Sequence, residues 1–324
     1  MQFEPVAKLP AREKSMILTN PYQNPHAGSA GGGDDILEKV DEPPLGQGAS
    51  KGRFCAAGSF ATGSFKRALV TGASSGLGKV LCEKIAAQGI PLIITGRNIE
   101  KLEELAHQLG SNPVVEAADL CKKSERQKII NLIHQYAPDL VINNAGFGFY
   151  GHTLALTTQE QLEIFEVNVN AVFELTVETA RALQAHDQPG TIVNISSAAA
   201  FFIYPTFTAY ASAKACVNNF SQALDAEFAP LGIRVLTACP GQFATSFRTR
   251  AAKGHPQQGS FGTMSVDRVA DQILAQIKRG QRLSIIDWRY KILTLLTKLL
   301  PQKWLQGALM KSLKKRHHMN MNTG

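Results

Sequence analysis

The chain has 324 residues, of which 44% are hydrophobic, so it is long enough to bury a large core. Its net charge of +8 lies in residues 281–324, which carry nine Lys or Arg and one acid. Residues 1–280 have no net charge, so their composition does not indicate binding to nucleic acid. The five cysteines include no CxxC pair, which argues against a disulfide framework or a metal site and indicates a reducing, cytoplasmic compartment.

Residues 1–65 lack the pattern of a folded domain. They are rich in Gly, Pro, Ser and Asn and show little apolar periodicity, so we expect a disordered N-terminal extension. No apolar stretch follows a basic start, and the acidic residues Glu4, Glu13, Asp34 and Asp35 argue against a transit peptide. A start codon assigned too far upstream is the alternative explanation for this segment.

A phosphate-binding loop is predicted directly after the first strand. The short apolar run 66–70 leads into a TGxxxGxG pattern and then a helix-like stretch. Glycines allow backbone N–H groups to approach a phosphate, and a helix N-terminus favours negative charge. The candidate cofactor-binding residues here are Gly72, Ser74, Ser75, Gly76, Leu77 and Gly78. The alternatives are an ordinary strand-to-helix turn and, because residues 72–76 fit GxSxG, a hydrolase nucleophile elbow with His255 as its late histidine.

The end of the second predicted strand, within residues 90–98, bears on the choice of cofactor. NAD-binding dinucleotide folds place an acid near this point to bind the ribose 2′-hydroxyl, whereas this chain has Gly96 followed by Arg97. A guanidinium can bind a 2′-phosphate through charge-assisted hydrogen bonds. The sequence therefore predicts NADP(H) in preference to NAD(H), although Arg97 could equally be a solvated turn residue.

Two further strand ends carry polar residues. Asp119 ends the strand-like run 114–119, and Asn144 lies where the apolar run that begins at residue 139 ends. Ligands bind at the carboxyl ends of the strands in open parallel sheets, so Asn144 is a cofactor-binding candidate. A plain Asx-turn is the alternative for Asn144.

Asn168 falls inside a long predicted helix, residues 159–183. A polar side chain that faces the core from a helix needs a hydrogen-bond partner, which makes it a candidate for a functional role. Asn170, two residues further on, is the competing candidate.

Tyr210 and Lys214 lie four residues apart in a predicted helix, thirteen residues after Ser197. Residues i and i+4 share one helix face, so we expect the ammonium to lower the pKa of the phenol and make it a usable proton donor. A serine hydroxyl close by could polarise a carbonyl. A surface tyrosine beside a solvated lysine is the alternative.

The segment after the strand 233–239 completes the predicted site. Pro240, Gly241 and Thr245 follow this strand, and residues 242–264 form a candidate lid with three glycines. Aromatic residues cluster around the motifs and favour an apolar substrate; they are Phe147, Phe149, Phe201, Phe202, Tyr204 and Phe207.

The tail, residues 288–324, is basic and amphipathic. Apolar residues recur at helical spacing on both sides of Pro301, and neither half reaches the roughly 20 apolar residues of a membrane-spanning helix. Attachment to a membrane surface is one interpretation. Docking of an amphipathic helix on the fold or on a second subunit is the other.

Together these segments resemble the short-chain dehydrogenase/reductase family from about residue 66 to about residue 287. The motifs in the family's order are the TGxxxGxG loop, Asp119, Asn144 with its neighbours, Asn168 in VNVNA, Ser197, the Tyr210/Lys214 pair, and Pro240-Gly241 followed by Thr245. The resemblance implies that Asp119 contacts adenine, that Asn144 buttresses the central strand, that Asn168 holds a water relaying protons to Lys214, and that Thr245 reaches the nicotinamide carboxamide or a phosphate. It also favours Ser197 over Ser196 and implies a homodimer or homotetramer.

The expected architecture is α/β, a single doubly wound parallel sheet with helices on both faces over residues 66–287, because strand-like and helix-like segments alternate there. The expected function is NADP(H)-dependent hydride transfer to or from a small-molecule carbonyl or alcohol. Ser197, Tyr210, Lys214 and Asn168 are the catalytic candidates, and Tyr210 and Lys214 also contact the cofactor. The alternatives are a non-catalytic NADP(H)-binding regulatory protein and the GxSxG hydrolase. We expect a cytoplasmic protein with a possible membrane-surface contact through its tail.

Overall fold

The computed structural model describes residues 65–243, 247, 251, 263–299 and 307. The predicted N-terminal extension up to residue 64, most of the candidate lid, Thr245, His255 and most of the tail after residue 299 lie outside this described part. The predictions made for those segments stay predictions.

The described strands form one parallel sheet in the order β3-β2-β1-β4-β5-β6-β7. Their bounds are β1 (Ala68–Thr71), β2 (Leu92–Gly96), β3 (Val114–Ala117), β4 (Leu140–Asn143), β5 (Gly190–Ile195), β6 (Ile233–Cys239) and β7 (Leu283–Ile285). The central strands β1, β4 and β5 are buried along their whole length. Such continuous burial is typical of strands that are covered on both faces.

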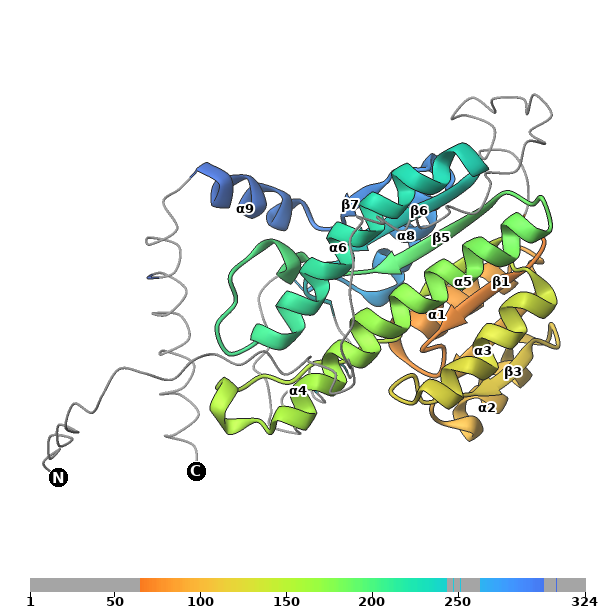
Figure 1. Cartoon of the computed structure of the whole chain (residues 1–324), viewed down its shortest axis with the longest axis horizontal. Helices are drawn as coiled ribbons and strands as arrows, with labels where there is room; N and C mark the ends of the chain where they lie inside the picture. Colours follow the sequence, from red (N-terminus) through yellow and green to blue (C-terminus); the bar gives the residue numbers. More distant parts are fainter. Residues whose placement is uncertain (1–64, 244–246, 248–250, 252–262, 300–306, 308–324) are drawn as a thin grey trace, which may run out of the picture. The chain divides into compact units, whose positions relative to one another are not determined.

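Helices cover both faces of the sheet (Figure 1). The α-helices are α1 (Gly76–Ala86), α2 (Ile99–Leu109), α3 (Lys123–Tyr136), α4 (Thr158–Phe165), α5 (Ala171–Ala185), α6 (Thr208–Phe228), α8 (Val266–Arg279) and α9 (Trp288–Leu299). Short helical turns are η2 (Thr153–Ala155), η3 (Glu166–Asn170), η4 (Ala198–Phe201) and η5 (Ala229–Leu231). One core joins α1, α2 and α8 to the sheet, and a second joins α3, α5 and α6. The predicted doubly wound parallel sheet is therefore confirmed.

The strand order reverses between β1 and β4, and this positions the site. From β1 the chain continues to β2 and β3 on one side, whereas β4, β5, β6 and β7 follow on the other. In open α/β sheets the crevice at such a reversal, at the carboxyl ends of the strands, is where ligands bind. The glycine loop after β1 and the Asn144 segment after β4 both lie there.

The predicted helix over residues 159–183 is helical along its whole length, but its middle is wound as a π-helix. Between α4 and α5, η3 forms a π-helical turn that contains Asn168. Arg126, which is buried, anchors this region through ion pairs of 2.6 Å to Glu166 in the turn and to Glu174 in α5. Such π-turns within α-helices are often found at functional sites.

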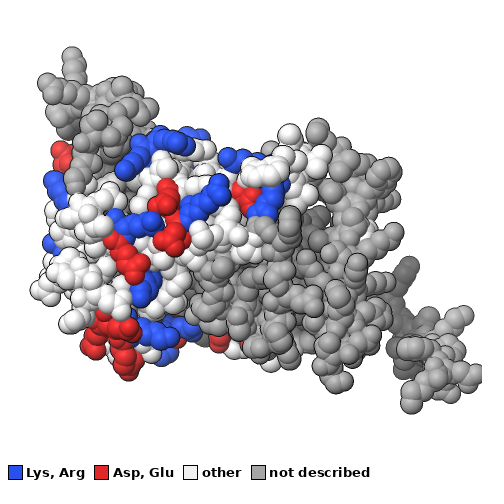
Figure 2. Space-filling view, turned by 180° about the vertical axis from the view of Figure 1, so that it is seen from behind, with Lys and Arg blue, Asp and Glu red and all other residues white. Residues whose placement is uncertain are grey.

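Charges on the described surface are mixed. The face in Figure 2 carries basic and acidic side chains side by side, in agreement with the neutral composition before residue 281. In the part of the chain that the structure covers, no helix combines the length and the apolarity needed to cross a membrane.

Candidate active site

One large cleft runs along the carboxyl edge of the sheet. Its volume is about 1750 Å³, which exceeds the roughly 300–1,000 Å³ of a pocket for a drug-sized ligand. It extends from the glycine loop and Arg97 to the aromatic residues around Tyr210. A cleft of this size and extent can hold a dinucleotide and a substrate together.

The glycine loop is shaped for close approach to a ligand. Gly72 and Gly76 have φ angles of +66° and +56°, in the left-handed region that favours glycine. A Cβ added at Gly78 would stand 2.2 Å from the carbonyl oxygen of Gly72 and 2.6 Å from Nδ2 of Asn144. Gly72 and Gly76 are therefore required for their φ angles, and Gly78 is required because no side chain fits there.

The N-terminus of α1 is prepared for an anion. Ser75 is the N-cap residue, but no side chain caps the helix, and the first turn contains no acidic residue. The free N–H groups and the positive end of the helix dipole can therefore bind a phosphate group. The residues present fit the pyrophosphate of a dinucleotide.

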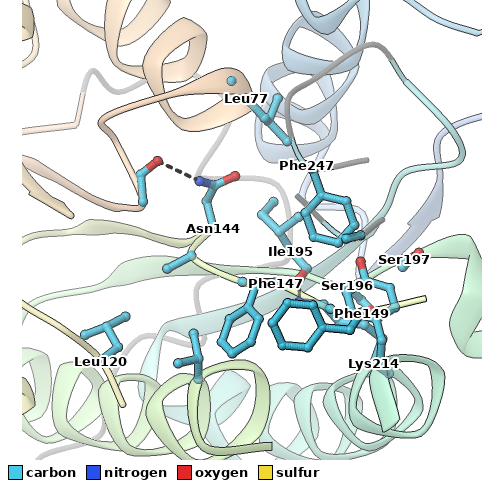
Figure 3. Close-up of a pocket in the computed structure, with 18 of the residues that line it drawn as sticks. Leu77, Leu120, Asn144, Phe147, Phe149, Ile195, Ser196, Ser197, Lys214 and Phe247 are labelled. Carbon is cyan, nitrogen blue, oxygen red and sulfur yellow. Dashed lines mark hydrogen bonds between the residues drawn. The ribbon is translucent and has the colours of Figure 1, made fainter. Parts of the chain in front are cut away.

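Asn144 ties the ends of β1 and β4 together beneath this loop. Its Nδ2 donates to the carbonyl oxygen of Thr71 at 2.9 Å, and its backbone N–H donates to Thr71 Oγ1 at 3.0 Å. Figure 3 shows the Asn144 side chain in the wall of the cleft. Ala145 N–H donates to the same hydroxyl at 3.0 Å. Asn144 thus buttresses the central strand and lines the cleft, in the place that the resemblance implied.

The far end of the cleft carries basic side chains. Arg97 is exposed and lines the cleft beside Gly96, where an added Cβ would stand 3.0 Å from Ser74 Oγ. Asp119 is half-buried in the same wall, and its Oδ1 accepts from Cys121 N–H at 3.1 Å. Lys101, in the first turn of α2, also lines the cleft and was missed in the sequence. The signal that could have found it is a second basic residue at the start of the helix that follows Arg97.

Asn168 is fully buried and its amide is held from two sides. Its Nδ2 donates to the carbonyl oxygens of Phe147 at 2.7 Å and Ile164 at 2.8 Å. Its Oδ1 has no hydrogen-bond partner among the described residues. A Cβ added at Gly146 would stand 2.5 Å from this oxygen and 3.3 Å from Lys214 Nζ. The two side chains therefore both lie next to Gly146. The competing Asn170 instead donates to Glu166 at 2.6 Å on the surface.

The two serines after β5 have different surroundings. Ser196 is buried, and its hydroxyl donates to the carbonyl oxygen of Lys214 at 3.0 Å. Ser197 accepts from Ala199 N–H at 3.1 Å at the start of η4, and its hydroxyl lies close enough to the Tyr210 phenol to lower the pKa of that phenol. Ser197 is therefore the serine that faces the tyrosine, and both serines and Lys214 are seen at one end of the cleft in Figure 3.

Tyr210 and Lys214 share one face of α6, as predicted, with Nζ of the lysine 5.7 Å from the centre of the phenol ring. The ammonium donates to the carbonyl oxygen of Ile195 at 2.9 Å. Burial lowers the pKa of Lys214 from 10.5 to about 8. The site thus contains a lysine that titrates near neutral pH.

The prediction that Lys214 lowers the pKa of Tyr210 is wrong for the protein chain itself. Burial raises the pKa of the phenol well above its ordinary value, and the hydrogen bond from Ser197 only partly opposes this effect. Water stabilises a phenolate strongly, and Tyr210 has little access to water. Sequence spacing placed the two groups correctly but could not give the burial that decides the direction.

Aromatic rings surround Tyr210. Phe207 stacks on it at 4.4 Å, and the ring of Phe247 lies 5.5 Å away. Phe147 and Phe149 form an edge-to-face pair at 5.5 Å, and both are labelled in the cleft in Figure 3. Among the aromatic candidates predicted from the sequence, all except Phe201 line the cleft. The lining residues that the sequence did not single out include Tyr150, Phe243, Phe247 and Tyr290.

The nicotinamide end predicted after β6 is partly described. Pro240 and Gly241 line the cleft, and the carbonyl oxygen of Pro240 accepts from Ala198 N–H at 2.9 Å. Thr245 lies outside the described residues. Cys239 is buried, and burial raises the pKa of its thiol to about 12, so it is an inert packing residue.

Comparisons with known proteins agree on one family. The model of the short chain dehydrogenase family matches residues 66–255. An uncharacterized oxidoreductase of Staphylococcus aureus is 31% identical over 184 residues, which cover 56% of this chain and 79% of that protein.

Two solved structures are similar over most of their length. A short-chain dehydrogenase from Sphingobium yanoikuyae in complex with NADPH has a TM-score of 0.65 and 29% identity, and the match covers 72% of this chain and 93% of that chain. A bulky-bulky ketone specific alcohol dehydrogenase from Comamonas testosteroni has a TM-score of 0.61 and 26% identity over 73% and 93% of the two chains.

Proposed function

Because the chain belongs to the short-chain dehydrogenase family, a family of oxidoreductases, we propose that it is an NADP(H)-dependent reductase of apolar carbonyl compounds. The observation that carries the proposal is the convergence of four side chains at one end of the cleft. Ser197 faces the Tyr210 phenol, Lys214 Nζ lies 5.7 Å from the Tyr210 ring, and Asn168 Oδ1 and Lys214 Nζ both lie next to Gly146. Because the chain belongs to this family, residues 72–76 are better explained as its glycine loop than as the nucleophile elbow of a hydrolase.

NADPH, when bound, would supply a hydride to the carbonyl carbon of the substrate. The glycine loop and the N-terminus of α1 would hold its pyrophosphate, Asp119 its adenine end, and Pro240 and Gly241 its nicotinamide end. Lys214 would contact the nicotinamide ribose. Thr245 is proposed for the carboxamide or phosphate on the resemblance alone.

Two side chains of the protein bind and protonate the carbonyl oxygen of the substrate. Ser197 donates a hydrogen bond to this oxygen and fixes it beside Tyr210, whose hydroxyl gives its proton to the alkoxide that develops there. A raised pKa keeps the phenol protonated at neutral pH, which is the state that a donor needs. The transfer is favourable because an alkoxide is a much stronger base than a phenolate.

Lys214 and Asn168 supply the replacement proton. The buried Oδ1 of Asn168 has no partner within the part of the chain that the structure describes and needs a donor, and a water molecule held there would be within reach of Lys214. With a pKa of about 8, the ammonium can release and regain a proton at neutral pH. This supports a relay from the Asn168 water through Lys214 towards Tyr210.

The test of this proposal is NADPH oxidation with a panel of aromatic and bulky ketones. The aromatic lining, and the ketone specificity named for the Comamonas relative, support this choice. We expect turnover, and we expect kcat/KM for NADPH, which reports the free enzyme, to fall above about pH 8 as Lys214 loses its charge. In a Lys214→Arg protein this fall should disappear. Tight NADPH binding without turnover of any ketone would favour the non-catalytic alternative.

The preference for NADP(H) is proposed from Gly96 and Arg97. Arg97→Ala should weaken NADPH binding by about tenfold to a hundredfold, as expected for the loss of a charge-assisted hydrogen bond, and should leave NADH binding within about twofold. Fluorescence titration with both nucleotides measures this difference. Arg279→Ala, which removes an exposed guanidinium from α8, is the control. An unchanged preference in the Arg97→Ala protein would contradict the assignment.

The assembly proposed is a homodimer or homotetramer in the cytoplasm. α5 and α6, the helices beside Asn168 and Tyr210, present Phe173 and Phe220 edge to face at 5.4 Å, with Phe173 45% exposed. An exposed aromatic pair on adjacent helices supports pairing through this face. Contact of the basic tail with a membrane surface is part of the same proposal.

A further inference from the structure

The C-terminal helix α9 forms part of the cleft wall through Tyr290. This half-buried side chain lines the cleft, and the backbone of Gln242 hydrogen-bonds its hydroxyl. A Cβ added at Gly241 would stand only 2.4 Å from Cε2 of Tyr290, so glycine allows the ring to pack on the backbone after β6. The ring of Phe202 lies 6.4 Å away. α9 lies beyond residue 255, where the match to the family model ends.

The opposite side of α9 is apolar and exposed. Trp288, Ile292 and Leu295 follow an i, i+4, i+7 spacing and are 68%, 50% and 59% exposed. At 3.6 residues per turn these side chains lie along one stripe, whereas Tyr290 points to the cleft from another side of the helix. Leu293 and Leu296 widen the exposed surface. Such a contiguous apolar face normally marks a binding surface.

Other exposed apolar side chains lie close to the cleft lining. Leu162 is 57% exposed and lines the cleft, and Ile203, 55% exposed, stands between the lining residues Phe202 and Tyr204. The exposed apolar face of α9, Leu162 and Ile203 therefore all belong to segments that contribute residues to the wall of the same cleft.

The charge of α9 identifies the partner that fits. The helix contains no acidic residue; Arg289 pairs with Asp287 just before the helix, and Lys291 and Lys298 add two further positive charges. Residues 281–324 carry nine basic side chains against one acid. An apolar stripe flanked by basic residues matches the surface of an anionic bilayer, which offers hydrocarbon beneath negative headgroups. A second copy of the chain would bring an equally basic tail against this one, and like charges oppose that pairing.

We propose that α9 docks on an anionic phospholipid bilayer and that the cleft takes its carbonyl substrate from that bilayer. The inference rests on the proposed function and names the substrate class, an apolar ketone or aldehyde that partitions into lipid. Trp288, Ile292 and Leu295 enter the interface, and Tyr290, on the same helix, holds the cleft wall next to it. The aromatic lining then receives the apolar body of the substrate.

The test compares the full chain with an Ile292→Glu/Leu295→Glu variant in vesicle flotation. We expect the wild-type protein to float with phosphatidylglycerol–phosphatidylcholine vesicles and not with phosphatidylcholine alone, and we expect the variant to bind at least about tenfold more weakly. Leu231→Glu, which introduces a single glutamate at an exposed leucine of η5, is the control and should float like the wild type. Equal NADPH affinity of all three proteins verifies folding.

A second arm follows turnover of two ketones, acetophenone in water and 4′-dodecylacetophenone in the anionic vesicles. The variant should lose at least about tenfold in kcat/KM for the vesicle-bound ketone and retain its value for acetophenone. Wild-type protein that ignores anionic vesicles, or a variant that floats normally, overturns the proposal. Equal use of the vesicle-bound ketone by both proteins overturns delivery from the bilayer. Normal flotation of the wild type with no turnover of either ketone counts against the reductase function and supports the docking surface.

Discussion

Replacing Tyr210 by phenylalanine is expected to lower kcat for carbonyl reduction by a factor of about 10²–10⁴, the range that a positioned proton donor contributes. The substitution removes the hydroxyl and keeps the ring, so the stacking with Phe207 at 4.4 Å and the contact with Phe247 at 5.5 Å are retained. Binding of NADPH should change by no more than about threefold, because the phenol is not expected to carry most of the cofactor's binding energy. Steady-state kinetics and a fluorescence titration separate the two effects.

Tyr204→Phe is the matched control for this prediction. Tyr204 lies in the same aromatic cluster, with its ring 5.7 Å from that of Phe207, and also lines the cleft. Losing its hydroxyl should change kcat by less than about threefold, since no proton transfer is assigned to it. Full turnover in the Tyr210→Phe protein would show that another group gives the proton to the alkoxide.

The features that could be predicted from the sequence are those that a short stretch of backbone determines. The glycine loop is one, because Gly72 and Gly76 need left-handed φ angles and Gly78 leaves no room for a Cβ. The shared helix face of Tyr210 and Lys214 is another, because helical periodicity alone brings residues four apart together. The parallel sheet followed from the alternation of strand-like and helix-like segments.

The features that were missed depend on contacts between distant segments. The π-helical turn at Asn168 is associated with the bond to Phe147 and with the ion pairs of Arg126, neither of which leaves a local pattern. The same is true of Tyr290, which reaches the cleft only because Gly241 lies beneath it.

The pKa of Tyr210 shows why identity and spacing do not determine the chemistry of a group. The lysine was placed correctly, but burial of the phenol has the larger effect on its pKa. Burial is a property of the folded core around Phe207 and Ala213, which no short motif encodes. Sequence motifs therefore give the parts of this site more reliably than they give the protonation state of each part.

Replacing Gly78 by alanine is expected to raise the Kd for NADPH by about tenfold or more and to lower the free energy of unfolding by about 1–3 kcal/mol, the usual cost of overpacking. The added methyl would stand 2.2 Å from the carbonyl oxygen of Gly72, which is backbone and cannot rotate away as a side chain could. To relieve the clash, either the start of α1 or the turn at Gly72 must move, and Asn144 Nδ2, 2.6 Å from the methyl, must move as well. The N–H groups that would bind the pyrophosphate then lose their alignment.

Gly89→Ala separates the effect on binding from the effect on stability. Gly89 has a φ of +75° and open space around its Cβ position, so alanine is strained there by about 1 kcal/mol and clashes with nothing. This protein should lose stability and bind NADPH with unchanged affinity, as measured by thermal unfolding and fluorescence titration. If Gly78→Ala bound NADPH as tightly as Gly89→Ala, the loop after β1 would not be the pyrophosphate site, and the nucleotide would have to be placed elsewhere in the cleft.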